Sequence, residues 1–301
     1  MTSPLLVVVL GPTAVGKTSV AIQLAKHFKT EIVSADSRQL FRELPIGTAA
    51  PSVEEMQGVP HHFIGNLSVA QRCDAGQWAG EARKVLDELF KKHDVVICAG
   101  GSGLYIDALL NGMDELPERD DTLRRELQDL FAEKGIGALQ EKLKTLDPEY
   151  YAQVDINNHK RLIRGIEVCI LSGGKYSEKR SGKQAELPFR VVKIGLEMDR
   201  EKLYERINQR VDQMMEAGLE KEARSVIAFR DNNALATVGY REMFDYFDGK
   251  TTLPQAIELI KQHSRNYAKR QMTWWRRDSS IKWFHPGKVD DVILWVSGRM
   301  C

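Results

Sequence analysis

Cysteine is scarce in this sequence: only Cys73, Cys98, Cys169 and Cys301 occur among 301 residues, far apart and without C-x-x-C spacing. Zinc sites and small disulfide-stapled folds need closely paired cysteines, so neither is expected. Long apolar runs are missing as well. The longest run near the start, Leu5–Leu10, is too short to span a membrane, and no charged segment with a small-residue cleavage site makes it a signal peptide. We therefore expect a cytoplasmic protein with reduced thiols and no membrane partner.

The net charge is only +1, which would say little about partners if the charges were evenly spread. Residues 1–117 carry 10 Lys or Arg and 13 Asp or Glu, and residues 118–157 carry 6 Lys or Arg and 10 Asp or Glu. Residues 158–301, in contrast, carry 27 Lys or Arg and only 19 Asp or Glu. The basic excess therefore lies in the second half of the chain. With 43% hydrophobic and 28% charged residues the composition is that of a globular protein, and the length suggests about two domains.

Two stretches hold much of the local basic excess. Lys261–Arg277 has six Lys or Arg and no acid, with Tyr267, Trp274 and Trp275 among them. Residues 158–183 have seven Lys or Arg and only two acids. Cations mixed with aromatic rings can neutralise phosphates and stack on bases, which is typical of nucleic-acid binding. For either stretch alone a solvated helix face is an equally good interpretation, and one of two adjacent helical tryptophans is expected to pack inward.

Strand-like and helix-like patterns alternate along most of the chain. The strand-like segments are 5–10, 31–34, 94–99, 189–196 and 281–284, and helical spacing covers 15–28, 76–92, 200–229 and 253–275. Strands alternating with helices predict an α/β protein with a doubly wound parallel sheet. After Pro117 three helix-like segments, 123–131, 136–146 and 159–171, follow with no strand among them. We therefore predict a core of 1–117 plus 188–301, interrupted by a helical insertion at 118–187.

The strongest chemical signal follows the first predicted strand. Gly11, Pro12, Thr13, Ala14, Val15, Gly16, Lys17 and Thr18 fit the pattern G-x-x-x-x-G-K-[ST] between a strand and a helix. In this pattern backbone N–H groups converge on phosphate oxygens, the lysine adds a positive charge and the last hydroxyl can hold Mg²⁺. We therefore predict a phosphate loop in a P-loop NTPase-like fold, with Lys17 on the terminal phosphate and Thr18 as the metal ligand. The motif alone does not identify the ligand as ATP.

Polar residues also follow the second and third predicted strands. Asp36 comes two residues after the strand-like segment 31–34, and Ser102 stands in a glycine-rich run at 100–103. Ligands collect at the carboxyl ends of strands in an open parallel sheet, so both residues would face the same crevice as the phosphate loop. Asp36 could then act as a general base or as an outer partner of Mg²⁺, and a helix cap is the alternative. For the glycine-rich run a simple tight turn is an equally good interpretation.

Two further pairs of residues are open to more than one interpretation. Arg206 and Arg210 lie four apart on a predicted helix, so they share a face and could reach a phosphate together or simply lie on the surface. His61 and His62 have no third ligand nearby at metal spacing, so we predict a loop pair there in preference to a metal site.

Six motifs, taken in order, resemble one known family. They are GPTAVGKT, ADSRQLF, GGSGLYI, HKRLIRGIEV, VGYREM and KRQMTWWR, and the resemblance runs from residue 5 to about residue 285. Only the first motif is widespread, and the others in this order are similar to bacterial tRNA dimethylallyltransferases, the tRNA isopentenyltransferases of the IPP transferase family. The resemblance implies transfer of a dimethylallyl group from dimethylallyl diphosphate to N6 of adenosine 37, beside the tRNA anticodon, with Mg²⁺ and with release of diphosphate.

The resemblance also implies roles for individual residues. It places Thr13, Gly16, Lys17, Thr18 and Arg210 on the diphosphate and its metal ion, and it makes Asp36 the base for the adenine amine. Ser37, Arg38, Gln39 and Ser102 would lie against the flipped nucleotide, with Ser102 keeping the hydroxyl of a threonine found in many members. The residues expected to contact tRNA elsewhere are Arg124, Lys160, Arg161, Leu162, Ile163, Arg164, Gly239, Tyr240 and Arg241. We further expect the anticodon stem-loop as the bound RNA, and a monomer.

Three other functions would use the same residues. A free-adenylate dimethylallyltransferase would share the phosphate loop and Asp36, although the long insertion at 118–187 argues against it. A small-metabolite or nucleoside kinase would use the same loop for phosphoryl transfer. A non-catalytic RNA-binding protein on this fold would be insensitive to loss of Asp36.

Overall fold

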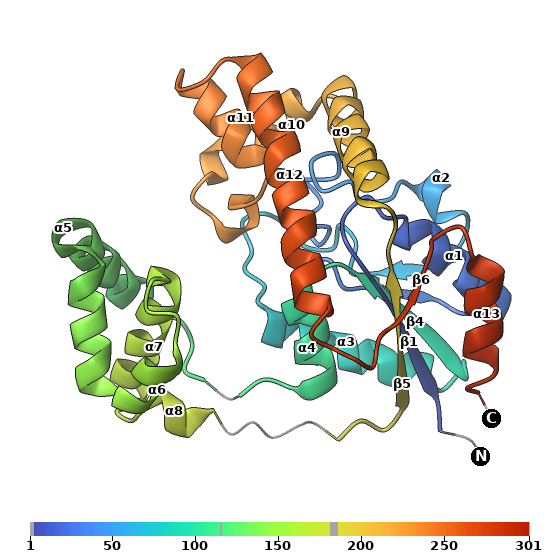
Figure 1. The fold of residues 1–301 in the computed structure, drawn as a ribbon, viewed down its shortest axis with the longest axis horizontal. Helices are drawn as coiled ribbons and strands as arrows, with labels where there is room; N and C mark the ends of the chain where they lie inside the picture. The colour runs from blue at the N-terminus through green and yellow to red at the C-terminus, as the bar shows by residue number, and fades with distance from the viewer. Residues whose placement is uncertain (1–2, 115, 181–185, 301) are drawn as a thin grey trace. The chain divides into compact units, whose positions relative to one another are not determined.

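The computed structural model describes residues 3–114, 116–180 and 186–300, and its contacts divide the chain into two units (Figure 1). The larger unit comprises Met1–Leu110 and Glu186–Cys301, and the smaller unit is Asn111–Ala185. Lys183, part of the second basic stretch, and Cys301 lie outside the described residues. The smaller unit is thus one continuous segment of chain between the two parts of the larger unit.

The larger unit is built on one six-stranded sheet in which every pairing is parallel. Its strands are β1 (Leu5–Leu10), β2 (Ile32–Ser34), β3 (His61–His62), β4 (Val95–Gly100), β5 (Arg190–Leu196) and β6 (Lys282–Phe284), in the spatial order β3-β2-β4-β1-β5-β6. The predicted parallel sheet is confirmed, and all five predicted strands form within a residue or so of their expected bounds.

The prediction of a loop at His61 and His62 is wrong, because these two residues form the short edge strand β3. Backbone pairing with β2 places His61 opposite Ile32 and His62 opposite Val33. The ring of His62 is also held, since its Nε2 lies 2.7 Å from Glu31 Oε2. A strand of two residues contains too little alternation for a periodic pattern to reveal it.

Helices cover both faces of the sheet. The helices of the larger unit are α1 (Lys17–Phe28), α2 (Val53–Met56), α3 (Ala75–Leu89), α4 (Gly103–Asn111), α9 (Arg200–Glu216), α10 (Leu219–Ser225), α11 (Tyr240–Phe247), α12 (Leu253–Trp275) and α13 (Val289–Ser297), with 3₁₀ turns η1 (Ile227–Phe229) and η2 (Asn233–Leu235). The helical segment predicted over 200–229 is not continuous, because Gly218 (φ 101°) separates α9 from α10. The helix predicted over 253–275 is confirmed. No helix in the described part of the chain combines the length and apolarity needed to cross a membrane.

β1 divides the hydrophobic core of the larger unit into two halves. All six of its side chains are buried, and they point alternately into two hydrophobic clusters. Residues of α3 and α4 complete one cluster, and residues of α1 and α13 complete the other. Burying one such side chain is worth about 1.5–3 kcal/mol. A strand that is apolar without interruption is therefore stable only with helices on both faces of its sheet.

The carboxyl ends of β1, β2 and β4 meet at one edge of the sheet, with β4 between the other two. At the end of β4, Gly100 lets two backbone segments touch, because a Cβ at this position would collide with Ala35 O. The phosphate loop follows β1, Asp36 follows β2, and Ser102 follows β4. These three polar segments are therefore neighbours.

Helices make up most of the described part of the smaller unit after residue 120, with α5 (Asp121–Leu146), α6 (Pro148–Gln153), α7 (His159–Ser172) and α8 (Tyr176–Lys179). The two helices predicted over 123–131 and 136–146 are the halves of α5, which bends at Gly135 (φ 73°). Leu139 and Leu143 of α5 and Leu162 of α7 are fully buried in a hydrophobic cluster that belongs to this unit alone. The unit is therefore stabilised by a core of its own.

Candidate active site

The phosphate loop, Gly11–Thr18, has a backbone suited to enclosing an anion. Gly11 and Gly16 have φ values of 147° and 107°, which L side chains rarely adopt, and a Cβ on Gly11 would lie 2.7 Å from Leu196 O. α1 begins directly after Gly16, and no side chain caps its first turn. The N–H groups at an uncapped helix N-terminus attract anions, so the loop is shaped to receive phosphate oxygens.

Lys17 holds its cation inside this loop. Its Nζ donates hydrogen bonds to Gly11 O at 3.0 Å and to Pro12 O at 2.8 Å. Burial lowers the pKa of Lys17 to about 8, with the Asp36 charge opposing the shift and the Arg210 charge adding to it. A bound anion would favour the charged form of Lys17. Phosphate binding and protonation of this lysine are therefore coupled.

α9 brings an arginine to the phosphate loop. Arg210 Nη1 donates to Thr13 Oγ1 at 3.4 Å, and its Nη2 donates to Ala49 O at 3.3 Å. Burial lowers the pKa of Arg210. Arg206, one turn earlier, is exposed, and its Nη2 lies 3.9 Å from the position that a Cβ on Gly16 would occupy. The helix face that the two arginines share is therefore the face beside the phosphate loop.

Gln271 of α12 connects two loops of the site, and the sequence offers no signal for it beyond its place in a basic stretch. Its Oε1 accepts a hydrogen bond from Thr13 N at 2.8 Å, and its Nε2 donates to Gly101 O at 2.9 Å. Thr13 and Gln271 are 258 residues apart, so only folding brings them together. The buried amide thus joins the phosphate loop to the turn that carries Ser102.

Asp36 and Ser102 lie on adjoining turns. Asp36 Oδ1 accepts hydrogen bonds from Arg38 N at 2.9 Å and from Gln39 N at 3.4 Å, whereas Oδ2 accepts none from the described residues. The residues directly after Asp36 form a turn, so the helix-cap alternative is wrong. Ser102 Oγ accepts from Ser37 N at 2.9 Å and donates to Ser37 Oγ at 3.1 Å. The structure thus brings the predicted base and two serine hydroxyls into one pair of turns.

The side chains of Arg38 and Gln39 are held by backbone carbonyls of the same unit. Arg38 Nη1 donates to Ala234 O at 3.2 Å and also to Asn233 O. Gln39 Nε2 donates to Ala49 O at 3.0 Å. Their contact with a flipped nucleotide stays a prediction, and these bonds orient the guanidinium and the amide before any ligand arrives.

α12 carries cations and aromatic rings on its exposed side. Of its two adjacent tryptophans, Trp275 is 3% exposed and lies in the core, whereas Trp274 is 38% exposed. This confirms the prediction that one of the two packs inward. Partial burial raises the pKa of Tyr267 to about 12, and the nearby Asp36 charge adds to the shift. A hollow on the helix is lined by Lys269, Arg270, Thr273, Trp274 and Arg277. Such a surface suits a phosphate backbone with a base stacked beside it.

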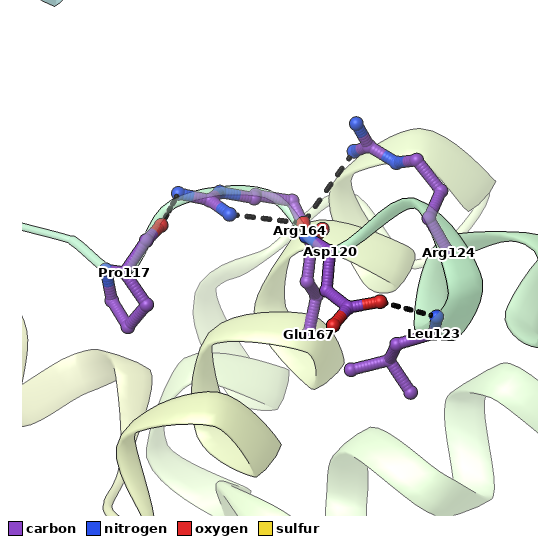
Figure 2. Close-up of polar contacts among 6 residues, drawn as sticks. All are labelled: Pro117, Asp120, Leu123, Arg124, Arg164 and Glu167. Carbon is purple, nitrogen blue, oxygen red and sulfur yellow. Dashed lines mark hydrogen bonds and ion pairs between the residues drawn. The ribbon is translucent and has the colours of Figure 1, made fainter.

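In the smaller unit, Arg124 and Arg164 converge on the buried carboxylate of Glu167 (Figure 2). Arg164 Nη1 lies 2.9 Å from Glu167 Oε2, and Arg124 Nη2 lies 3.7 Å from the same oxygen. Arg164 Nη2 also donates to Pro117 O at 3.0 Å, and Asp120 N donates to Glu167 Oε1 at 3.2 Å. Arg124 and Arg164, two of the arginines that the resemblance assigns to tRNA, are thus held by one carboxylate.

The remaining residues expected on tRNA differ in their exposure. The exposed ones are Lys160 and Arg161 at the start of α7, and Arg241 on α11. The side chains of Leu162, Ile163 and Tyr240 are buried in the cores of their units, and Gly239 (φ 100°) forms the turn before α11. The exposed cations are open to RNA phosphates, whereas the buried side chains support the surface around them, and contact of these residues with tRNA stays a prediction.

The residues around the phosphate loop fit a Mg²⁺ ion that is held mainly by its phosphate ligand. Thr18 has an exposed side chain at the start of α1. The described residues contain no group of three or more His, Cys, Asp or Glu side chains that could hold a metal ion by themselves. Mg²⁺ bound with phosphates commonly uses one or two protein oxygens and keeps several waters. The Thr18 hydroxyl is a donor of this kind.

A parallel sheet with a phosphate loop after β1, and polar turns after β2 and β4, defines a P-loop protein of the α/β class. Comparison with known proteins identifies the family. The family model described as IPP transferase matches residues 39–278, and the chain belongs to this family.

Curated relatives match nearly the whole chain. The chain is 48% identical over 290 residues to tRNA dimethylallyltransferase 1 of Bacteroides thetaiotaomicron, covering 96% of this chain and 94% of that protein. It is 50% identical over 289 residues to tRNA dimethylallyltransferase 2 of Porphyromonas gingivalis, covering 96% of each.

Solved structures agree with the sequence comparison. The tRNA isopentenylpyrophosphate transferase from Bacillus halodurans is similar with a TM-score of 0.73 at 37% identity, covering 98% of this chain and 96% of that one. A eukaryotic dimethylallyltransferase acting on tRNA is similar with a TM-score of 0.81 at 25% identity, covering 99% of this chain and 77% of that one.

Replacing Glu167 with alanine should destabilise the smaller unit, because two arginines lose the buried carboxylate that they share. Removing one partner of a buried ion pair lowers the free energy of unfolding by about 3–5 kcal/mol. Because the arginines here are partly exposed, we expect a loss of about 3 kcal/mol. Hydrogen exchange of the α7 amides in the full-length chain measures this loss. The matched control is Lys160→Ala, because Lys160 is exposed on the same helix. This substitution should change the free energy of opening of the α7 amides by less than about 0.5 kcal/mol. Equal exchange in both variants would contradict the stabilising role of Glu167.

Binding of diphosphate should weaken as the pH rises above about 8, where Lys17 of the free protein loses its proton. Because the bound anion favours the charged form, binding then requires proton uptake, and the affinity falls by up to about tenfold per pH unit. Titration calorimetry with inorganic diphosphate at several pH values measures the slope. Lys17→Ala serves as the control, since any pH dependence that remains belongs to diphosphate itself. A slope identical in the two proteins would show that Lys17 does not titrate on binding.

Proposed function

We propose that this chain transfers the dimethylallyl group of dimethylallyl diphosphate to N6 of adenosine 37 in tRNA and releases diphosphate. The observation that carries the proposal is the placement of Asp36 beside the phosphate loop, where its charge acts on both Lys17 and Arg210. A carboxylate base next to an anion site is what this transfer requires. The relatives named tRNA dimethylallyltransferases, 48–50% identical to this chain, support the same reaction.

The acceptor amine N6 is a weak nucleophile because its lone pair is delocalised into the adenine ring. In the proposed step, a bond forms between N6 and the allylic carbon while the bond from that carbon to the diphosphate oxygen breaks. The electron pair of the broken bond leaves with diphosphate, and the proton of N6 passes to Asp36. Asp36 Oδ2 accepts no hydrogen bond from the described residues, so this oxygen is open to receive that proton.

The phosphate loop stabilises the charge that builds on the departing diphosphate. Lys17 Nζ is held by Gly11 O and Pro12 O, and Arg210 Nη1 by Thr13 Oγ1, so both cations already lie at the loop where the diphosphate would leave. Thr18 is the residue that would hold Mg²⁺, which when bound would neutralise further charge on the leaving group. The allylic carbon tolerates positive character, so assistance to the leaving group lowers the barrier directly.

Adenosine 37 must leave its base stack to reach Asp36, at a cost of a few kcal/mol. Contacts between exposed cations and RNA phosphates can offset that cost. The exposed cations available for such contacts are Lys269 and Arg270 on α12, Arg277 just after it, Lys160 and Arg161 on α7, and Arg241 on α11. The proposed partner is the anticodon stem-loop of tRNA, bound in the cytoplasm by a monomeric enzyme.

The direct test supplies purified protein with dimethylallyl diphosphate, Mg²⁺ and an unmodified anticodon stem-loop. Mass spectrometry of the digested RNA should find dimethylallyladenosine at position 37. Parallel reactions with AMP as acceptor, and with ATP and nucleosides as substrates, test free-adenylate prenylation and kinase activity. Product only with AMP, or phosphorylation without prenylation, would overturn the proposal.

Asp36→Asn should lower the turnover number by about 10²–10⁴-fold, because the amide keeps an oxygen for the turn but cannot accept the N6 proton. Affinity for the stem-loop, measured by fluorescence anisotropy, should hardly change. Asp87→Ala, an exposed carboxylate on α3, is the control and should leave turnover as it is. Full turnover in Asp36→Asn would exclude this residue as the base.

A further inference from the structure

Glu222 of α10 is a carboxylate that accepts three hydrogen bonds and has no Lys, Arg or His partner among the described residues. Its Oε2 accepts from Ile46 N at 2.8 Å, and its Oε1 accepts from Gly47 N at 2.8 Å and from Tyr240 Oη at 2.6 Å. Glu222 therefore holds two successive backbone amides of the loop 45–50 in a fixed position.

Tyr240, the first residue of α11, fixes the same loop from the core. Its side chain is fully buried, and a Cβ on Gly47 would lie 2.6 Å from Tyr240 Cζ and Oη, so the ring touches the loop backbone. Burial raises the pKa of the Tyr240 hydroxyl, and the charge of Glu222 adds to the shift. The hydroxyl therefore stays protonated and remains a donor to Glu222.

The other side of the loop 45–50 contacts two side chains that face the substrates in the proposed reaction. Ala49 O accepts from Arg210 Nη2 at 3.3 Å and from Gln39 Nε2 at 3.0 Å, and Thr48 O accepts from Gln39 Nε2 at 3.3 Å. Ala49 has a φ of 47°, a left-handed conformation that a non-glycine residue adopts only when its surroundings impose it. The loop is therefore held in one defined shape.

We infer that Glu222 and Tyr240 are positioning residues for prenyl transfer. They fix the loop 45–50, and its carbonyl groups set the Arg210 guanidinium toward the diphosphate and the Gln39 amide toward the nucleotide. The inference rests on the proposed function, in which Arg210 and Gln39 serve the two substrates. Neither Glu222 nor Tyr240 touches a substrate, so their effect on the reaction passes through this loop.

The first test compares Tyr240→Phe and Glu222→Gln with the wild-type full-length chain in the stem-loop assay. Tyr240→Phe keeps the ring that packs on Gly47 and removes only the hydroxyl donor. A misplacement of about 1 Å at a reacting group can cost up to about 10²-fold, so kcat should fall by about 10–100-fold at an unchanged melting temperature. Tyr246→Phe, on the same helix with no hydroxyl partner among the described residues, is the matched control and should leave kcat unchanged. Wild-type kcat in Tyr240→Phe would overturn the inference.

A double-mutant cycle separates positioning from a general structural role. If Tyr240 acts through Arg210, then Tyr240→Phe should lower kcat by less than about threefold in a background that already carries Arg210→Ala. Residues that act independently would instead show the full loss in both backgrounds. That additive outcome would refute the positioning role through Arg210.

Binding of inorganic diphosphate tests this inference separately from the proposed function, because the measurement requires neither tRNA nor turnover. Tyr240→Phe should bind diphosphate several-fold more weakly than the wild type in titration calorimetry, even if the stem-loop proves not to be the acceptor. Equal diphosphate affinity in the two proteins, or no diphosphate binding by the wild type, would count against the inference. Failure of prenyl transfer in the wild type together with a weakened diphosphate affinity in Tyr240→Phe would overturn the proposed function alone.

Discussion

The candidate active site depends on how closely two backbone turns approach each other at the edge of the sheet. Gly100 has no side chain, so the end of β4 packs directly against Ala35, where any Cβ would collide with the carbonyl oxygen. Ser102 N also donates to Ala35 O at 3.3 Å. These contacts place the turn that carries Ser102 on the turn that carries Asp36. The proposed base and the neighbouring hydroxyls therefore derive their positions from one glycine.

The charges around this edge are arranged for a substrate that brings negative charge with it. Lys17 and Arg210 lie beside the phosphate loop, burial lowers the pKa of each, and Asp36 is the carboxylate that opposes both shifts. The charges of Arg206 and Glu55 also act on Arg210, so three cations and two carboxylates leave the site net positive. The negative charge of a diphosphate group would balance this positive charge. The same cations would stabilise the diphosphate as it departs as the leaving group.

The residues that the family motifs assign to RNA contribute in physically different ways. Lys160 and Arg161 are exposed and can meet phosphates directly. Arg124 and Arg164 form ion pairs with the buried Glu167, and these pairs stabilise the smaller unit. Tyr240 is buried and donates a hydrogen bond to Glu222, and we infer that it influences the reaction through the loop that it supports. We therefore expect some residues of these motifs to serve the substrate directly and others through the residues that they hold.

Local patterns were sufficient to predict β1, the phosphate loop and α12, because an apolar run, glycine spacing and helical periodicity involve only residues close in the chain. The edge strand at His61 and His62 was missed because two residues show no period. Gln271 and Glu222 were missed because they act on partners 258 and 176 positions away. The sequence by itself determined which elements form and where an anion can bind. Only the tertiary structure decided which polar side chains meet there, since a hydrogen bond needs atoms about 3 Å apart and that distance is set by the packing of helices on the sheet.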